Sequence, residues 1–371
     1  MQSDNVDSRP LNVVVLAAEE SGQMRSTRPK PLHRLCGRPM VRYVLDAVES
    51  LSPTRVVVVV GNGAERVTRE VAGTKPVTDI VEQVRRSGNA AGVLAGLSVM
   101  DDDFDTDADI VIVPADVPLV GGADLGRLVE QHRSTGAAAT VMAADGDDLG
   151  TLENYARIIR GGRDDTIQRV ADATDLVGDE RFINEVATDI WCVRQSVLAA
   201  ALRRAQPDYS GDVAIAGIIE VLAATGHPVH VSRSANATDV VGINDRVELA
   251  DAEAELRRRT NRAWLERGVT MLDPARTYID ATVELAPDVT LYPGVILQGD
   301  TIVGEGSEIG PDTRLVDTTV GPGCRVEKTM AERSVIGPDC HVGPFAVLCE
   351  GSELTAATVT GPFYAPSAGG H

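Results

Sequence analysis

The sequence predicts a doubly wound, Rossmann-like α/β domain followed by a short left-handed parallel β-helix of hexapeptide repeats. Three observations predict this architecture. Continuous apolar runs alternate with helical patterns in the first part of the chain, one long helical pattern follows, and apolar residues then recur at every sixth position. We expect an α/β domain, a linking helix, a truncated β-helix and a loose tail over residues 1–245, 246–268, 269–355 and 356–371.

The first domain is predicted from runs of valine and isoleucine, which are typical of parallel strands covered on both faces. These runs are NVVVL at 12–16, RVVVVVG at 55–61 and DIVIVPAD at 109–116. Helix-like stretches, such as 40–51 and 90–100, separate them. Strand–helix–strand alternation predicts a doubly wound sheet that binds its ligands at the carboxyl ends of the strands.

The second half of the chain has a different pattern. Residues 246–268 show helical spacing, many i,i+4 pairs of charges and a terminal glycine, which together predict one long helix. Apolar residues then recur six apart in several registers, beginning with Val283, Val289 and Val295, and glycine follows many of them. This is the signature of a parallel β-helix with an inward apolar stack. The open end of such a short β-helix is usually protected by oligomerisation or a cap.

Composition limits the classes of partner. A net charge of −20 argues against nucleic acid or an anionic membrane, although phosphates can still bind at a local positive site. There is no run of about 18 apolar residues and no charged-then-apolar leader, so we predict neither a membrane span nor a signal peptide. The five cysteines include no Cys-x-x-Cys pair. They favour reduced thiols in a cytoplasm, without zinc or a disulfide framework.

The stretch LAAEESGQMRSTRPKPLH, residues 16–33, has the position of a phosphate-binding loop. It follows the first apolar run and contains a Pro-Lys pair. However, Glu19 and Glu20 stand where an anion-binding loop favours glycine and positive charge.

Taken together, these features resemble the family of bifunctional N-acetylglucosamine-1-phosphate uridyltransferases/glucosamine-1-phosphate acetyltransferases. The similarity extends from about residue 10 to about residue 350. It rests on the ordered words VVLAA, RPKPLHRLCGRPM, VVVVVGNGAE, PADVPL, YARIIR, DATD, INEV, VVGINDRVELA, DPARTYIDATVEL and YPGVILQGDTIVGEGSEIGP. The resemblance implies that the first domain joins a uridylyl group to a sugar 1-phosphate with Mg²⁺. It also implies a homotrimer formed through the β-helix, which carries an acetyltransferase site.

The resemblance assigns Asp116 and Asn244 to Mg²⁺ and Lys30 to the phosphates, with Lys30 and Asp116 as catalytic residues. Nucleotidyl transfer is an in-line displacement that needs positioning and charge neutralisation, and oxygen donors suit Mg²⁺. Taken alone, the three residues are more typical of a turn-capping Asp, a turn Asn and a solvated Lys. The resemblance further assigns nucleotide and phosphate contacts to Leu16, Ala17, Ala18, Glu19, Gln23, Lys30, Ser87 and Gly88, and sugar contacts to Ala156, Arg169 and Ala187.

The chain departs from the family's pattern in the phosphate loop. The two loop glycines of the family are Glu19 and Ser21 here, its threonine is Gly22, and its arginine is Gln23. Loop glycines allow backbone N–H groups to close on a phosphate, and arginine supplies a bidentate clamp. We therefore expect weaker binding of a triphosphate.

Base and sugar contacts also differ. The family's base-reading glutamine aligns with Val81, which has no group to hydrogen-bond a uracil edge. Its sugar-contacting glycine, glutamate and asparagine align with Ala156, Arg169 and Ala187. Arg169 thus reverses a charge, and either it meets an anionic group on a different substrate or it is a surface arginine.

The acetyltransferase activity is predicted to be lost. The chain stops soon after GPFAVLCEG at 343–351, where the family continues with further coils, and the expected arginine aligns with Cys349. We interpret His341, beside the inward Val342, as a solvated side chain rather than a catalytic base.

Three functions remain open. One is a divergent Mg²⁺-dependent nucleotidyltransferase with altered base or sugar-phosphate specificity. Another is a catalytically dead homologue that acts as a trimeric binding or scaffold protein. The third is an enzyme that reuses the cleft for other chemistry, with Glu19 or Glu20 as a general base or an additional metal ligand.

Overall fold

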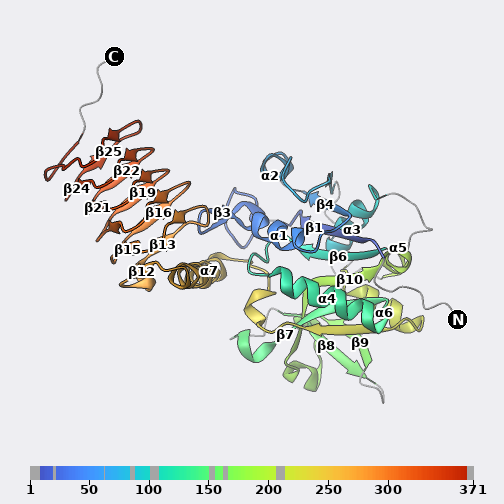
Figure 1. Ribbon diagram of the computed structural model, residues 1–371. Coiled ribbons are helices and arrows are strands. Elements are labelled where there is room, and N and C mark those ends of the chain that lie inside the picture. The colour runs from blue at the N-terminus through green and yellow to red at the C-terminus, as the bar shows by residue number, and fades with distance from the viewer. Residues whose placement is uncertain are drawn as a thin grey trace. The chain divides into compact units, whose positions relative to one another are not determined.

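The computed structural model confirms the predicted fold class, an α/β domain followed by a left-handed parallel β-helix (Figure 1). It divides into two compact units. Unit 1 comprises Met1–His33 and Pro39–Glu248, and unit 2 comprises Arg34–Arg38 and Leu249–His371. The residues that it describes are 9–19, 22–61, 63–83, 88–100, 108–149, 155–161, 166–205 and 214–365.

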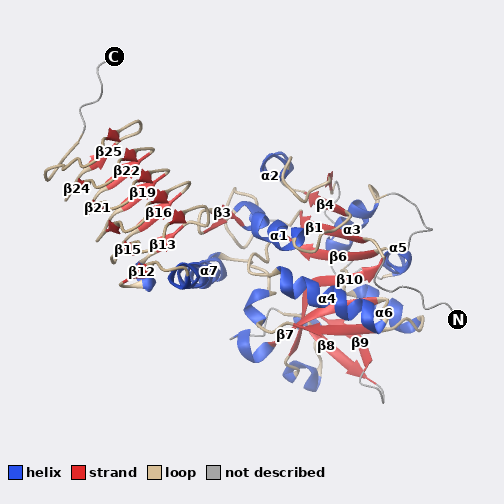
Figure 2. Cartoon of the chain, in the orientation of Figure 1, coloured by secondary structure: helices blue, strands red, loops and turns tan. Residues whose placement is uncertain are grey.

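Within the described residues, nine strands of unit 1 form one mixed sheet (Figure 2). The strands are β1 (Leu11–Ala17), β4 (Arg55–Val60), β5 (Asp79–Glu82), β6 (Asp109–Pro114), β7 (Ala139–Asp145), β8 (Arg157–Gly161), β9 (Thr166–Ala171), β10 (Glu185–Arg194) and β11 (Val229–Arg233). Their order is β11-β7-β10-β6-β1-β4-β5, and β8 pairs with both β10 and β9. The three predicted strands are β1, β4 and β6, which are parallel, whereas β10 runs antiparallel to β6 and β7.

Helices cover both faces of this sheet, as the continuous apolar runs predicted. The helices of unit 1 are α1 (Met40–Glu49), α2 (Ala64–Val71), α3 (Gly88–Leu97), α4 (Gly122–Thr135), α5 (Gln195–Arg204) and α6 (Gly217–Ala224). Val13 and Val15 belong to the core cluster that includes α1, α2 and α4. Val14 belongs to the opposite cluster, which includes α3, α5 and α6. Successive strand residues thus pack on opposite faces.

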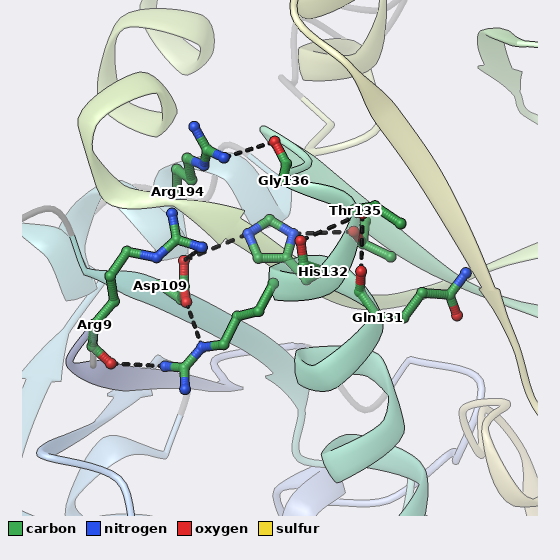
Figure 3. Close-up of polar contacts among 9 residues, drawn as sticks. Arg9, Asp109, Gln131, His132, Thr135, Gly136 and Arg194 are labelled. Atoms are coloured by element: carbon green, nitrogen blue, oxygen red, sulfur yellow. Dashed lines mark hydrogen bonds and ion pairs between the residues drawn. The ribbon is translucent and has the colours of Figure 1, made fainter. Parts of the chain in front are cut away.

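A buried charge cluster lies at the amino end of β6 (Figure 3). Nε of Arg133 donates to Oδ2 of Asp109 at 2.8 Å. Nε2 of His132 and a guanidinium nitrogen of Arg9 lie 3.5 and 3.4 Å from Oδ1. Burial would raise the pKa of Asp109, but hydrogen bonds from His132 and Arg133 outweigh it and lower that pKa. These contacts fix the amino edge of the sheet, and the carboxyl edge is the one expected to bind ligands.

Unit 2 builds its β-helix from three parallel sheets, each with five strands in the described residues. Its strands are β12 (Thr270–Met271), β13 (Tyr278–Ile279), β14 (Glu284–Leu285), β15 (Thr290–Leu291), β16 (Ile296–Gln298), β17 (Ile302–Val303), β18 (Glu308–Ile309), β19 (Arg314–Val316), β20 (Thr319–Val320), β21 (Arg325–Val326), β22 (Met330–Glu332), β23 (Val335–Ile336), β24 (His341–Val342), β25 (Val347–Leu348) and β26 (Glu353–Leu354). A two-stranded ribbon, β2 (Arg34–Leu35) and β3 (Arg38–Pro39), precedes α1 in the chain.

The six-residue repeat arises because one side chain of each short strand points inward. Val283, Val289 and Val295, each two residues before an inward strand residue, are buried too, as are the repeat residues that follow them in the chain. Glycines mark one corner, where successive coils approach closely. A Cβ on Gly321 would lie 2.6 Å from the backbone nitrogen of Pro338, so this corner excludes any side chain. His341 is exposed beside the buried Val342.

The helix expected over 246–268 is α7 (Arg246–Glu266), and Gly268 beyond it has a φ of +93°. The tail was expected to be loose from residue 356. Its described part, 356–365, is instead hydrogen-bonded to the last coil, because the N–H of Thr360 donates to the carbonyl of His341 and the N–H of Val347 donates to the carbonyl of Tyr364. All five cysteines are free thiols. Among the described residues, no helix has the length and apolar character that crossing a membrane requires.

Candidate active site

The candidate site lies at the carboxyl ends of β1 and β6. These strands are parallel neighbours, so the segments that follow them leave the sheet at the same edge. Glu19 follows β1, and Asp116 follows β6. The N–H of Ile243 donates to the carbonyl of Asp116 at 2.9 Å, and this bond places Asn244 beside the same edge. Three segments that are distant in the sequence therefore meet here.

Lys30 lies at the centre of this group. It begins the short 3-10 helix η2 (Lys30–Leu32), and its residue is only 2% exposed. Its Nζ lies 2.5 Å from Oδ2 of Asp116, 2.8 Å from Oε2 of Glu19 and 3.0 Å from Oδ1 of Asn244. Burial opposes the positive charge, but the carboxylates of Asp116 and Glu19 outweigh burial and raise the pKa of Lys30. The ammonium is therefore charged and contacts three oxygen atoms, one for each of its hydrogens.

The Glu19 carboxyl is the most solvent-exposed member of this group. Its side chain is 59% exposed, in contrast to the buried Lys30 and Asp116. Enclosure by the surrounding protein and the charge of Asp116 raise the pKa of Glu19 to about 7, against the opposing effect of Lys30. Because the carboxyl still reaches solvent, water screens part of these interactions.

Asp116 has unused hydrogen-bonding capacity. Its residue is 5% exposed, and its Oδ1 has no hydrogen-bond partner among the described residues. Leaving a buried carboxylate oxygen unpaired costs free energy, so this atom is suited to an external ligand. Hard oxygen donors such as this one and Oδ1 of Asn244 fit Mg²⁺. The described residues contain no cluster of three or more His, Cys, Asp or Glu side chains placed to hold a metal.

Asn244 is fixed by the start of α7. Oδ1 of Asp245 accepts from the N–H groups of Val247 and Glu248, which caps the helix. Oε2 of Glu248 in turn accepts from the N–H of Asn244 at 2.5 Å. No sequence pattern marks Glu248 beyond its place in the first turn of a predicted helix.

The other predicted nucleotide contacts in the described residues lie on two parts of the chain, the segment around and after the end of β1 and the start of α3. Leu16 and Ala17 end β1, and Ala18 follows them. Gln23 is exposed in the turn that begins at Gly22. Gly88 begins α3, whereas Ser87, Glu20 and Ser21 lie outside the described residues.

Val81 is a half-buried residue of β5 that packs against the apolar core cluster that contains Val14 of β1. The side chain of the nearby Gln83 is hydrogen-bonded to the carbonyl of Gly88 at 3.1 Å. Val81 thus contributes apolar packing at this end of the sheet.

The predicted sugar contacts lie on or beside strands β8, β9 and β10. The N–H of Ala187 donates to the carbonyl of Ala156 at 3.0 Å, so these two residues are neighbours. Arg169, on β9, makes an ion pair with Glu180, with both carboxylate oxygens 2.8 Å from the same guanidinium nitrogen. Of the two interpretations of Arg169, this pairing favours a structural arginine, because its charge already has a partner.

Sequence reasoning missed Asp189. It lies on β10, where the ladder with β7 is interrupted between Ala187 and Trp191. Such irregularities redirect side chains and are common beside active sites. Its side chain is exposed, yet enclosure by protein and the charges of Asp116 and Asp172 raise the pKa of Asp189 to about 6. No local pattern marks Asp189, because the interruption of the ladder breaks the regular alternation of this strand.

Known proteins resemble this chain over most of its length. A family model described as a MobA-like NTP transferase domain matches residues 13–266. Relatives named bifunctional protein GlmU from Streptomyces avermitilis and Streptomyces coelicolor are each 37% identical over 356 residues, which is 96% of this chain and 73% of theirs. One from Kineococcus radiotolerans is 37% identical over 95% of this chain and 71% of its own.

The chain belongs to the GlmU family. Its GlmU kinship includes both units, because the aligned segment is nearly the whole chain. The match to the transferase domain begins within β1 and extends to the end of α7, and therefore contains Lys30, Asp116 and Asn244. Unit 1 is accordingly a nucleotidyltransferase domain of the GlmU family.

Proposed function

We propose that the protein transfers a nucleotidyl group from a nucleoside triphosphate to a sugar 1-phosphate, or to a sugar-like 1-phosphate, and releases pyrophosphate. The convergence of Lys30, Asp116 and Asn244 at the carboxyl edge of the sheet carries this proposal. Their resemblance to residues that meet the phosphates and the metal, together with the membership of unit 1 in a transferase family, supports it.

In this reaction an oxygen of the sugar phosphate attacks the α-phosphorus, and the bond to the leaving pyrophosphate breaks. Oδ1 of Asp116 and Oδ1 of Asn244 would hold Mg²⁺, which supplies charge neutralisation to the phosphates when it is bound. Lys30 contributes a fixed positive charge beside the same oxygens. Glu248 keeps Asn244 in place through its backbone N–H. Catalysis in such a site consists of positioning and electrostatic stabilisation.

We propose a specificity that differs from the uridylyl transfer implied by the resemblance. Val81 presents only a hydrocarbon side chain, so it cannot hydrogen-bond the edge of a base. Ala156 and Ala187 offer methyl groups where the family has contacts to the sugar. Arg169 is engaged by Glu180, and Asp189 adds a negative charge. These features favour a sugar that carries no anionic group besides its 1-phosphate.

The proposal includes no acetyl transfer. Cys349, in place of the expected arginine, carries an exposed thiol rather than a permanent cation. We also propose a homotrimer assembled through the β-helix. Outward positions of its strands carry large apolar side chains that are between 42% and 55% exposed, namely Tyr278, Ile302, Met330, Val335 and Val347. Sedimentation equilibrium tests this assembly, and a monomer would contradict it. The cytoplasmic location stays a prediction.

One observation favours a second candidate, a catalytically inactive binding protein. Three protein oxygens already contact the ammonium of Lys30, so a phosphate must displace at least one of them. The third hypothesis, general-base chemistry at Glu19 or Glu20, has less support, because Glu19 is paired with Lys30.

The deciding experiment is a pyrophosphate-release assay with Mg²⁺, over the common nucleoside triphosphates and a panel of sugar 1-phosphates. We expect turnover with at least one pair and its loss in Asp116→Asn. An Asp116→Asn variant with an unchanged rate would remove Asp116 from the mechanism. No turnover with any pair, and no nucleotide-induced rise in melting temperature, would reject the transferase. Nucleotide binding without turnover would favour the inactive binding protein.

A further inference from the structure

Three side-chain oxygens of unit 1 surround one point in space. That point is Nζ of Lys30, and Asp116 Oδ2, Glu19 Oε2 and Asn244 Oδ1 all lie within 3.0 Å of it. They come from the end of β1, the end of β6 and the segment before α7. Two carboxylates and an amide oxygen directed at one cation form the kind of donor set that hard divalent cations take.

A second observation points to a missing ligand at the same place. Oδ1 of Asp116 has no hydrogen-bond partner among the described residues, although the side chain is only 7% exposed. Its sister oxygen is directed at Lys30, so the carboxyl has one oxygen in use and one free. A buried carboxylate oxygen without a donor or a metal is costly. A cation that contacts both Glu19 and Asp116 would remove this cost.

The charges of this group favour a cation over an anion. With both carboxyls ionised, Glu19 and Asp116 contribute two negative charges and Lys30 one positive charge, so the group then has a net charge of −1. The position where the family has an arginine is the neutral Gln23. Phosphates approaching this group alone meet a net negative field, whereas a divalent cation is attracted to it and changes its charge to +1.

We propose that Glu19 completes a divalent-cation site with Asp116 and Asn244, so that this protein binds its metal before, and without, a nucleotide. Glu19 is the residue that would allow metal binding without a nucleotide, because Asp116 and Asn244 alone offer one carboxylate and one amide. The ammonium of Lys30 and the divalent cation compete for the same three oxygens. Occupation of the site by the metal therefore frees Lys30 N–H groups for a phosphate oxygen.

The alternative is that Glu19 is only the partner of an ion pair at the mouth of the site. Exposed ion pairs contribute little to stability, so that role predicts a nearly silent substitution. The two roles differ in nucleotide-free metal binding. Metal binding itself does not depend on the proposed function; only the consequence for phosphate binding rests on it.

The test is a titration of the full-length protein with Mn²⁺ alone, in which the electron paramagnetic resonance signal of free Mn²⁺ reports binding. We expect one site in the wild type and its loss in Asp116→Asn. Glu19→Gln should weaken binding by roughly tenfold or more, the loss typical of removing a supporting group from a metal site. The matched control is Glu65→Gln, an 86% exposed carboxylate on α2 that pairs with Arg69, and it should bind Mn²⁺ like the wild type.

Two results would overturn the proposal: a wild type that binds no Mn²⁺ without nucleotide, or a folded Glu19→Gln variant whose affinity equals that of the wild type. Circular dichroism and urea unfolding establish that each variant is folded, and Glu19→Asp supplies a second variant that keeps the charge but shortens its reach. Mn²⁺ binding without pyrophosphate release would uphold this site and reject the transferase. Pyrophosphate release without nucleotide-free Mn²⁺ binding would do the reverse.

Discussion

Nζ of Lys30 lies 2.5 Å from Oδ2 of Asp116, and the two side chains are only 2% and 7% exposed. Removing both charges from water is costly, and their mutual attraction offsets that cost only when other hydrogen bonds complete the geometry. Glu19 and Asn244 provide those bonds to Lys30. The pair therefore contributes to the stability of unit 1 as well as to its proposed chemistry.

Lys30→Met is expected to destabilise the protein strongly. It leaves the buried carboxylate of Asp116 without a counter-charge, and breaking a buried pair in this way typically costs about 3–5 kcal/mol. Urea unfolding measures the change. The control is Lys75→Met, which removes an exposed lysine and should leave the free energy of unfolding nearly unchanged. Equal stability of the two variants would show that the Lys30 pair is not structural.

Asp189→Asn is expected to lower the KM for a sugar 1-phosphate in the pyrophosphate-release assay. The substitution removes a negative charge near Asp116 and Lys30. Because Asp189 reaches solvent, screening limits the gain to roughly severalfold. Glu220→Gln, on the exposed side of α6, is the matched control. A KM that does not change would place Asp189 outside the sugar-phosphate subsite.

Asp109→Asn is expected to destabilise unit 1 by about 3–5 kcal/mol, because it leaves the cations around a buried carboxylate unpaired. Activity per folded molecule should not change, since Asp109 is at the amino edge of the sheet. Asp79→Asn is the matched control. Asp79 also begins a strand and pairs with an arginine, but it is part-exposed, so its loss should cost less than about 1 kcal/mol.

The contribution of Asp109 should also depend on pH. Its folded-state pKa is lower than the unfolded value, so its stabilisation is fully present above pH ~4 and is lost as the pH falls through the folded-state pKa. The difference in unfolding free energy between the wild type and Asp109→Asn should therefore shrink below pH ~4. A difference that stays constant down to pH ~3 would contradict the lowered pKa.

Gly321→Ala is expected to loosen the β-helix locally. The new Cβ would lie 2.6 Å from the nitrogen of Pro338, and overpacking of this kind costs about 1–3 kcal/mol. Faster hydrogen exchange in β20 and β23 would report the change. Gly361→Ala is the control, because no atom lies within 4 Å of its added Cβ. Equal exchange in both variants would show that the corner can expand freely.

Local sequence patterns were enough to predict the fold class. The runs that became β1, β4 and β6 each contain at least four consecutive apolar residues, because helices cover both faces of the sheet. The six-residue repeat predicted the β-helix, since each short strand buries one side chain. The antiparallel β10 was not predicted. Strand direction depends on pairing with distant segments, and a short apolar run is compatible with either direction.

The sequence by itself determined which residues are candidates: Lys30 in the loop after the first strand, Asp116 at a strand end, Asn244 before a helix, and Glu19 in place of a glycine. Only the tertiary structure decided that the carboxyl and amide oxygens of the other three meet at the Lys30 ammonium, and that the interrupted strand brings Asp189 close enough for the charge of Asp116 to raise its pKa. Periodicity reports burial along one segment, whereas a charge cluster depends on contacts between residues as far apart as Lys30 and Asn244. Such contacts are fixed by strand order and by single hydrogen bonds, such as the one from Ile243 to Asp116.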